Sequence, residues 1–218
     1  YNHGWVIRTP NHTWAHDFYP GDSESAMTGE QVDGILGEVE ALFCSHWHGD
    51  HSSPEVIQRA VAKGIPVFVS PLPEGEWSGM LRQRLYQDAD SAAMSRLMTV
   101  VELGGRGEVS GITYHAYPGH QGELENCVFV ITVDGMTFMQ TGDQSNDADF
   151  AWIDRVSDEY TVDVLLPNVW TTDLPRMARG VKPRVIIPGH ENELGHNFEH
   201  REPYAQAFER LEPLDYEW

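Results

Sequence analysis

Short apolar runs separated by polar and glycine-rich stretches predict strands and helices in the first hundred residues. Strands are expected as a pair within 4–18, at 42–45 and at 66–70, and helices at 52–64 and 78–97. The first of these helices has clear start and stop signals. Ser52 or Ser53 is the N-cap, Pro54 takes the first helical position and Gly64 ends the helix. Met and Leu recur at helical spacing in the second, which indicates a face packed on the core.

The second half of the chain is richer in strands. Strands are expected at 98–103, 111–118, 127–133, 136–142, 162–167 and 184–190, with helices near 148–157 and at roughly 199–211. Asp134 and Gly135 form a strong hairpin signal between two of these strands. Each half therefore reads as strands followed by helices, which favours an α/β fold with two sheets packed face to face and helices outside.

The chain has 218 residues, 40% of them hydrophobic, and we expect one domain spanning residues 1–218. Its formal charge is −20, and Lys63 and Lys182 are the only lysines. Such a field repels a phosphate backbone, so nucleic acid is not expected as a partner. High solubility, as in a salty habitat, explains the charge without any specific cationic partner. A small-molecule substrate is expected, and the oligomeric state is left open.

No apolar run approaches the ~18 residues needed to span a bilayer, so we expect a soluble protein without a membrane partner. The chain opens on YNHGWVIRTP, already strand-like, which is compatible with the loss of a few upstream residues, a leader among them. The cytoplasm is slightly favoured, and secretion is the alternative if a leader has been removed. Cys44 and Cys127 lie in apolar strand-like contexts and are expected to be buried free thiols.

The stretch SHWHGDHSS, residues 45–53, places three of the 11 histidines and an aspartate within six positions. His46 and His48 are two residues apart, so on an extended segment both rings point the same way, as chelation requires. Asp50 and His51 follow where the chain turns towards a helix, and they can address a second ion. Imidazole together with carboxylate suits Zn²⁺, and also Mn²⁺ or Fe²⁺.

Further candidate ligands stand at strand ends downstream. His120 in AYPGHQG, Asp143 in MQTGDQS and His190 in VIIPGHE each follow apolar β sequence and a glycine, which permits close approach of the backbone. Each of these signals is weak alone, but together they complete the donor set that two ions need.

HWHGDH matches the H-x-H-x-D-H signature of the metallo-β-lactamase superfamily, and PGH, TGD and PGH resemble its remaining ligand motifs in order and approximate spacing. The resemblance covers nearly the whole chain and implies a four-layer αβ/βα sandwich with the metals at one edge between the sheets. It implies one metal at His46, His48 and His120, a second at Asp50, His51 and His190, and Asp143 as their bridge.

The same resemblance implies a binuclear hydrolase that uses two divalent ions, with zinc favoured over manganese or iron. A hydroxide held between the ions would attack a carbonyl or phosphoryl centre, and Asp50 or Asp143 could carry a proton to the leaving group. His196 is a third catalytic candidate, as a proton donor beside the metals; the alternative is an exposed loop residue.

Among the chemistries of the superfamily, the sequence favours hydrolysis of a small anionic lactone or ester, with a metal-dependent phosphodiesterase as the alternative. Two lysines, neither beside a ligand motif, disfavour a β-lactamase, and the acidic final segment LEPLDYEW disfavours a glutathione thioesterase. Redox members of the superfamily resemble this scaffold but carry H-x-E-x-D-H and a flavin domain. A metal-binding protein without hydrolytic activity is a further alternative.

Arg176, Arg179, Lys182 and Arg184 form the only local basic run. They could grip an anionic substrate or simply balance the acidic surface as a solvated loop.

Trp47 and Trp170 either line the pocket or pack in the core. His115 competes with His120 as a ligand, although the Pro-Gly turn before His120 fits the pattern better. Asp17 is expected to support the histidine loop through hydrogen bonds.

Overall fold

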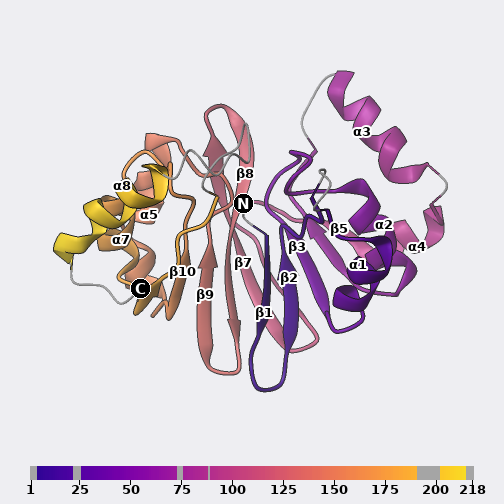
Figure 1. The fold of residues 1–218 in the computed structure, drawn as a ribbon, viewed down its shortest axis with the longest axis horizontal. Helices are drawn as coiled ribbons and strands as arrows, with labels where there is room; N and C mark the ends of the chain where they lie inside the picture. Colours follow the sequence, from indigo (N-terminus) through magenta and orange to yellow (C-terminus); the bar gives the residue numbers. More distant parts are fainter. Residues whose placement is uncertain (1–3, 22–25, 73–75, 88, 191–201, 215–218) are drawn as a thin grey trace.

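Two β-sheets face each other in the computed structural model, and helices cover the outer face of each (Figure 1). The structure describes residues 4–21, 26–72, 76–87, 89–190 and 202–214. The four layers confirm the expected αβ/βα sandwich.

The first sheet comes from the first half of the chain, with strand order β1-β2-β3-β4-β5. Its strands are β1 (Trp5–Arg8), β2 (Thr13–His16), β3 (Ala41–Cys44), β4 (Val67–Val69) and β5 (Met98–Val100). β1 and β2 are antiparallel, and the remaining neighbours are parallel. Its helices are α1 (Gly29–Leu36), α2 (Pro54–Ala62), α3 (Glu76–Tyr86) and α4 (Ser91–Leu97). They lie on the right of Figure 1, away from the second sheet.

The second sheet has the order β11-β10-β9-β8-β7-β6. Its strands are β6 (Arg106–Val109), β7 (Ile112–Gln121), β8 (Leu124–Val133), β9 (Met136–Gln140), β10 (Val164–Leu166) and β11 (Val185–Ile186). β6 to β9 form an antiparallel meander, and β9, β10 and β11 run parallel. The other elements are η1 (Asp147–Asp149), α5 (Phe150–Ile153), α6 (Val156–Glu159), α7 (Leu174–Val181), α8 (Glu202–Leu211) and η2 (Glu212–Leu214).

The space between the sheets is filled mainly by aromatic and branched side chains. Phe43 of β3 is fully buried and stacks on Phe68 of β4, with ring centroids 5.0 Å apart. Phe129 of β8 meets Phe43 edge to face at 5.2 Å. Such contacts between two sheets fix their relative position, and with it the distance between the loops that each sheet carries.

Local signals explain several elements. Ser53 is the N-cap of α2 and accepts a hydrogen bond from the Val56 amide, with Pro54 in the first turn, as predicted. Asp134 and Gly135 both have positive φ, 51° and 75°, in the predicted hairpin between β8 and β9.

Other expectations are corrected by the structure. The helix expected across 78–97 is two helices, because Asp90 caps the amides of Ala92 and Ala93 and starts α4 anew. The region 148–157 likewise divides into η1, α5 and the start of α6. The final helix is described over Glu202–Leu211, and its end agrees with the expected 199–211, whereas residues 199–201 lie outside the described residues.

Four elements were not predicted, namely α1, β6, α7 and η2. In α7, basic residues alternate with apolar ones, but Leu174, Met177, Ala178 and Val181 are all buried and recur at helical spacing. Asp173 caps this helix by accepting from the Arg176 amide.

In the part of the chain that the structure describes, no helix has the length and apolar character needed to cross a bilayer. Cys44 and Cys127 are buried and free, as expected, and burial raises the pKa of the Cys127 thiol well above its ordinary value.

Candidate metal centre

Six of the seven candidate ligands converge at one edge of the sandwich because they follow the carboxyl ends of strands. The loop containing His46 to His51 follows β3, Asp143 follows β9 and His190 follows β11. Since β9, β10 and β11 are parallel, their carboxyl ends meet at a common edge. This edge faces the histidine loop of the first sheet.

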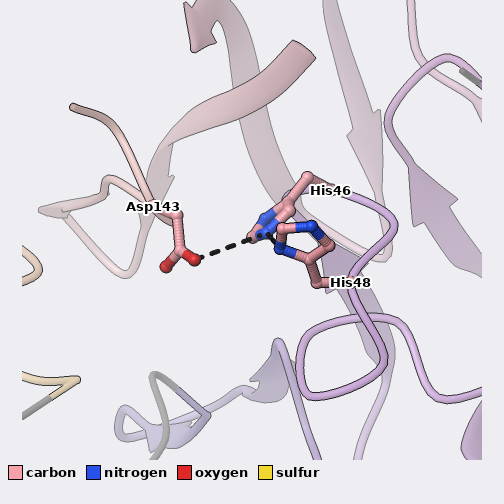
Figure 2. Close-up of side chains that lie close together, drawn as sticks. All are labelled: His46, His48 and Asp143. Carbon is pink, nitrogen blue, oxygen red and sulfur yellow. Dashed lines mark hydrogen bonds and ion pairs between the residues drawn. The ribbon is translucent and has the colours of Figure 1, made fainter. Parts of the chain in front are cut away.

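A first cluster consists of His46, His48 and Asp143 (Figure 2). His46 Nε2 lies 3.1 Å from His48 Nδ1 and 3.5 Å from Asp143 Oδ2. Two ligand atoms on a tetrahedral zinc ion with bonds of ~2.0–2.1 Å lie about 3.3 Å apart. The observed separations therefore match the spacing of donors around one ion.

A second cluster consists of Asp50, His51 and His190. His51 Nε2 lies 3.1 Å from His190 Nε2, and Asp50 Oδ2 lies 3.5 Å from the first and 3.6 Å from the second. His51 and His190 are fully buried, whereas the side chain of Asp50 is 23% exposed.

Asp143 stands between the two clusters. Its Oδ2 faces His46 at 3.5 Å, and its Oδ1 lies 3.2 Å from His51 Nε2 and 3.3 Å from His190 Nε2. Its side chain is fully buried, and neither oxygen accepts a well-aligned hydrogen bond from the described residues. A buried carboxylate that lacks such bonds is costly unless a cation compensates it. One oxygen turned to each cluster is the arrangement of a bridging ligand.

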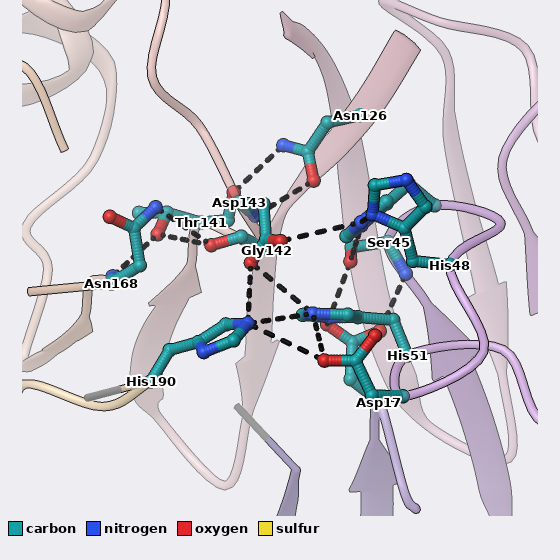
Figure 3. A network of polar contacts seen from close by, with 12 residues as sticks. Asp17, Ser45, His48, His51, Asn126, Thr141, Gly142, Asp143, Asn168 and His190 are labelled. Carbon is teal, nitrogen blue, oxygen red and sulfur yellow. Dashed lines mark hydrogen bonds and ion pairs between the residues drawn. The ribbon is translucent and has the colours of Figure 1, made fainter. Parts of the chain in front are cut away.

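The backbone before Asp143 is shaped by Gly142 (Figure 3). Gly142 has φ +53°, and a Cβ at this position would lie 2.1 Å from Asn126 Oδ1 and 2.6 Å from Ser45 Cβ. Only glycine allows this approach. Asn126 Oδ1 accepts from the Asp143 amide at 3.0 Å, and Asn168 Nδ2 donates to the Gly142 carbonyl at 3.1 Å.

Asp17 supports both clusters from behind. Its carboxylate accepts from His51 Nδ1 at 2.9 Å, from the Ser45 hydroxyl and amide at 2.7 Å each, and from Gln140 Nε2 at 3.0 Å. The Ser45 oxygen in turn lies 3.0 Å from His46 Nδ1. Asp17 therefore holds His51 directly and His46 through Ser45, with Nε2 of each ring turned to its cluster. The structure confirms the supporting role predicted for Asp17.

The two clusters differ electrostatically. Burial lowers the pKa of His46 and the nearby His51 lowers it further, so this pKa lies well below its ordinary value. Burial also disfavours the charged form of His51, but Asp143 and Asp17 outweigh it and raise the pKa of His51 well above its ordinary value. Burial would raise the pKa of Asp143, but the neighbouring histidines hold it well below its usual range.

The donors present fit a pair of divalent ions. Nitrogen and carboxylate donors converge at chelating distances, Asp143 is a buried anion without aligned donors, and buried polar groups hold the rings. This chemistry suits zinc, manganese or iron, and it does not distinguish between them.

His120 lies outside both clusters. Its ring is 37% exposed, and its Nδ1 is 2.7 Å from Asp149 Oδ1. The predicted assignment of His120 to the first ion stays a prediction. His115 also belongs to neither cluster. Its Nδ1 lies 3.0 Å from the Tyr160 hydroxyl instead, on the face of β7 towards α6. His196 lies outside the described residues.

The two tryptophans fall in different places. Trp47 is a core residue, only 2% exposed, and its indole donates to the Ser70 carbonyl. Trp170 is half-buried, and its ring meets the edge of His190 at 5.5 Å between centroids. Trp170 is therefore the one of the two that borders the candidate centre.

The basic run is not a loop. Arg176 and Arg179 lie on α7, and Lys182 caps its end with φ 50°. Arg176 pairs with Asp154 at 2.6 Å and lies over the Phe150 ring, while Arg184 pairs with Asp163 at 3.1 Å. These pairs favour the interpretation of the run as local charge balance.

Sequence reasoning missed several residues that hold the ligands. Asn126, Gln144, Asn168 and Thr171 are fully or almost fully buried polar residues around the Asp143 loop. Asn168 directly follows an apolar strand and a proline, the same kind of signal that identified His120 and Asp143. Asp149 is 3% exposed and had no distinguishing signal in its own stretch, which contains several aspartates.

Comparison with known proteins gives both sequence and structural relatives. No protein-family model matches the chain. The endoribonuclease YSH1 of Eremothecium gossypii is 28% identical over 134 residues, which cover 52% of this chain and 17% of that protein. The endoribonuclease ysh1 of Aspergillus fumigatus is 26% identical over 205 residues, 84% of this chain and 23% of that protein. The chain thus spans less than a quarter of the length of these relatives.

Solved structures share the architecture at low identity. CmlA, a diiron β-hydroxylase from Streptomyces venezuelae, aligns with a TM-score of 0.66 and 13% identity over 99% of this chain and 50% of its own. The metallo-β-lactamase fold protein YhfI from Bacillus subtilis aligns with a TM-score of 0.64 and 14% identity, over 94% of this chain and 83% of its own. A diphosphatase of the PhnP family aligns with a TM-score of 0.51 and 14% identity, over 86% of this chain and 71% of its own. The chain has the metallo-β-lactamase fold.

Proposed function

We propose that this chain is a metal-dependent hydrolase that holds two divalent ions side by side. The observation that carries the proposal is Asp143, a buried carboxylate with one oxygen directed at each of two histidine clusters. A site for a single ion would not need two clusters around one carboxylate.

His46, His48 and Asp143 would hold the first ion, completed by His120, and Asp50, His51, His190 and Asp143 the second. When bound, such a pair of ions activates water near neutral pH and offsets negative charge that develops on the scissile group. The residues keep this region ordered and largely dry, since His46, His51, Asp143 and His190 are all fully buried.

Asp50 is the better candidate for moving a proton to the leaving group. Its side chain is 23% exposed, whereas Asp143 is fully buried and enclosed by imidazoles. A carboxylate that both solvent and substrate can reach can take up and release protons during turnover.

For the substrate, we place a small phosphoric diester first and a lactone or carboxylic ester second. The relatives include proteins named as endoribonucleases and a diphosphatase, which supports phosphoryl chemistry. The formal charge of −20 disfavours a polynucleotide as substrate, since a field of this sign repels a phosphate backbone. The lactone or ester stays as the second choice for a reason of charge. Arg176 and Arg184 are already paired with aspartates, so these two arginines would not bind a strongly anionic phosphoryl substrate.

The test is turnover of an aryl phosphodiester, a γ-lactone and a short RNA by protein loaded with zinc or manganese, with a chelated sample as control. Metal-dependent cleavage of the diester alone supports the first choice. Opening of the lactone alone would replace it with the second, and RNA cleavage would contradict the charge argument. Two tightly bound ions with no turnover of any substrate would favour a metal-binding protein without hydrolytic activity.

A further inference from the structure

Asp149 holds His120 by two hydrogen bonds at once. Asp149 Oδ1 lies 2.7 Å from His120 Nδ1, and Asp149 Oδ2 accepts from the His120 backbone amide at 2.9 Å. Asp149 is only 3% exposed, whereas the His120 ring is 37% exposed. A buried carboxylate therefore fixes both the backbone and the ring of a more exposed histidine.

The segment that carries Asp149 also carries Asp143. Gln144 Nε2 donates to Asp149 Oδ2 at 3.3 Å, and Gln144 Oε1 accepts from the Thr171 hydroxyl at 2.7 Å. The Ser145 amide donates to the His120 carbonyl at 2.8 Å. Residues 143–149 thus form one hydrogen-bonded unit that places the bridging carboxylate and His120 relative to each other.

The contact also determines which nitrogen of His120 is available. A carboxylate oxygen accepts from the ring, so Nδ1 carries a proton, and in the neutral imidazole the lone pair then lies on Nε2. Imidazole with one nitrogen held by a carboxylate and the other free is the arrangement that second-shell carboxylates impose on metal-binding histidines.

We propose that Asp149 is a positioning residue, which holds His120 with its Nε2 lone pair ready to complete the first metal site. The inference rests on the proposed binuclear function. It explains why His120, although outside the cluster of His46, His48 and Asp143, is fixed by a buried carboxylate rather than left as a solvated side chain.

The first test reads the tautomer of His120 in the wild-type protein without metal, from long-range ¹H–¹⁵N correlations of the imidazole. The expected result is a proton on Nδ1. A ring protonated on Nε2, or one that exchanges freely between the two forms, would overturn the proposal. This readout needs neither bound metal nor activity, so it stands even if the proposed function fails.

The second test titrates zinc into metal-free wild-type protein, D149N and D147N by calorimetry. Asp147 is the matched control, an exposed aspartate in the same 3₁₀ helix. We expect two ions in wild type and D147N, whereas D149N should keep one tight site and weaken the other by about 10–100-fold. Two unchanged sites in D149N would refute the role of Asp149. Fewer than two sites in wild type would instead contradict the proposed function.

A double-mutant cycle with H120A separates positioning from simple structural support. If Asp149 acts through His120, the D149N/H120A protein should bind zinc no more weakly than H120A alone. A further loss at both sites in the double variant would mean that Asp149 supports the fold instead, and would overturn the proposal.

Discussion

The two ligand clusters are built from the same residue types but differ in how firmly the protein encloses them. In the second cluster, His51 and His190 are fully buried, and Asp17 contacts His51 directly at 2.9 Å. In the first, His48 is half-buried, and the fourth expected ligand, His120, has a ring that is 37% exposed. The comparison indicates that the fold encloses both histidines of the second cluster, whereas His48 and His120 on the first side are more open. In the second cluster, only Asp50 among its three members is partly exposed, at 23%.

Removal of the shared ligand should have the largest effect. Asp143→Ala takes away a carboxylate that faces both clusters, so we expect hydrolytic activity to fall on the order of 10³-fold. The paired binding of two ions should be lost, as measured by metal analysis after dialysis. Retention of two tightly bound ions per chain in this variant would refute the bridging assignment.

Gly142→Ala should distort the same region through the backbone. The added Cβ would lie 2.1 Å from Asn126 Oδ1 at a φ of +53°, so we expect a loss of about 3 kcal/mol in the free energy of unfolding. Gly135→Ala is the control, because its φ is +75° but nothing lies within 4 Å, and its cost should be about 1 kcal/mol. Equal losses in urea denaturation would show that packing around Asp143 is loose.

Asp17→Asn should affect the two clusters unequally. Asp17 contacts His51 directly but reaches His46 only through Ser45. We expect affinity at the second site to fall by about 10–100-fold and affinity at the first to fall less. Zinc calorimetry measures the affinity of each site. A greater loss of affinity at the first site would contradict the direct support of the second cluster by Asp17.

Metal uptake should release protons mainly from the second cluster. The raised pKa of His51 keeps its proton at neutral pH, and its contribution to the stability of the metal-free fold is lost as pH rises above ~6.5 through that raised pKa. The lowered pKa of His46 has the opposite effect on stability. Because the fold keeps this ring neutral while the unfolded chain takes up a proton, the free energy of unfolding falls as pH drops below ~6.5. We expect about one proton released per pair of ions at pH 7. Calorimetry in buffers of different ionisation enthalpy measures it, and no release would contradict these assignments.

The smallest effect is expected far from the centre, where the hairpin of the second sheet meets the first. Asp134 accepts from the amide and side chain of Asn11, and these hydrogen bonds, with one from Thr9, lower the pKa of Asp134 to about 2. Its stabilising contribution is therefore present above pH ~4 and is lost as pH falls towards 2. Asp134→Asn should flatten the acid limb of the stability profile slightly and leave metal binding unchanged.

Much of this arrangement could be predicted from the sequence, because strand ends and ligand types are both local signals. The histidine loop, Asp143 and His190 each follow an apolar strand. The structure brings six residues of these segments into the two clusters, namely His46, His48, Asp50, His51, Asp143 and His190. Support by Asp17 was also predicted, since it ends a strand.

The remaining features depend on contacts between distant segments, which no local pattern encodes. Asn126 of β8 and Asn168, just after β10, hold the Asp143 loop, and Asp149 reaches back 29 residues to His120. The helix α7 was missed for a different reason, because its arginines masked a buried apolar face. Periodicity and ligand type therefore predict which residues can bind metal, but not which residues hold them in place.

The most direct test of the account is the distance between the two ions. X-ray absorption spectra of protein loaded with two equivalents of zinc should show metal–metal scattering at about 3.5–4 Å, and Asp143→Ala should abolish it. Two bound ions without this feature, or a single ion per chain at saturation, would contradict the shared carboxylate on which the account depends.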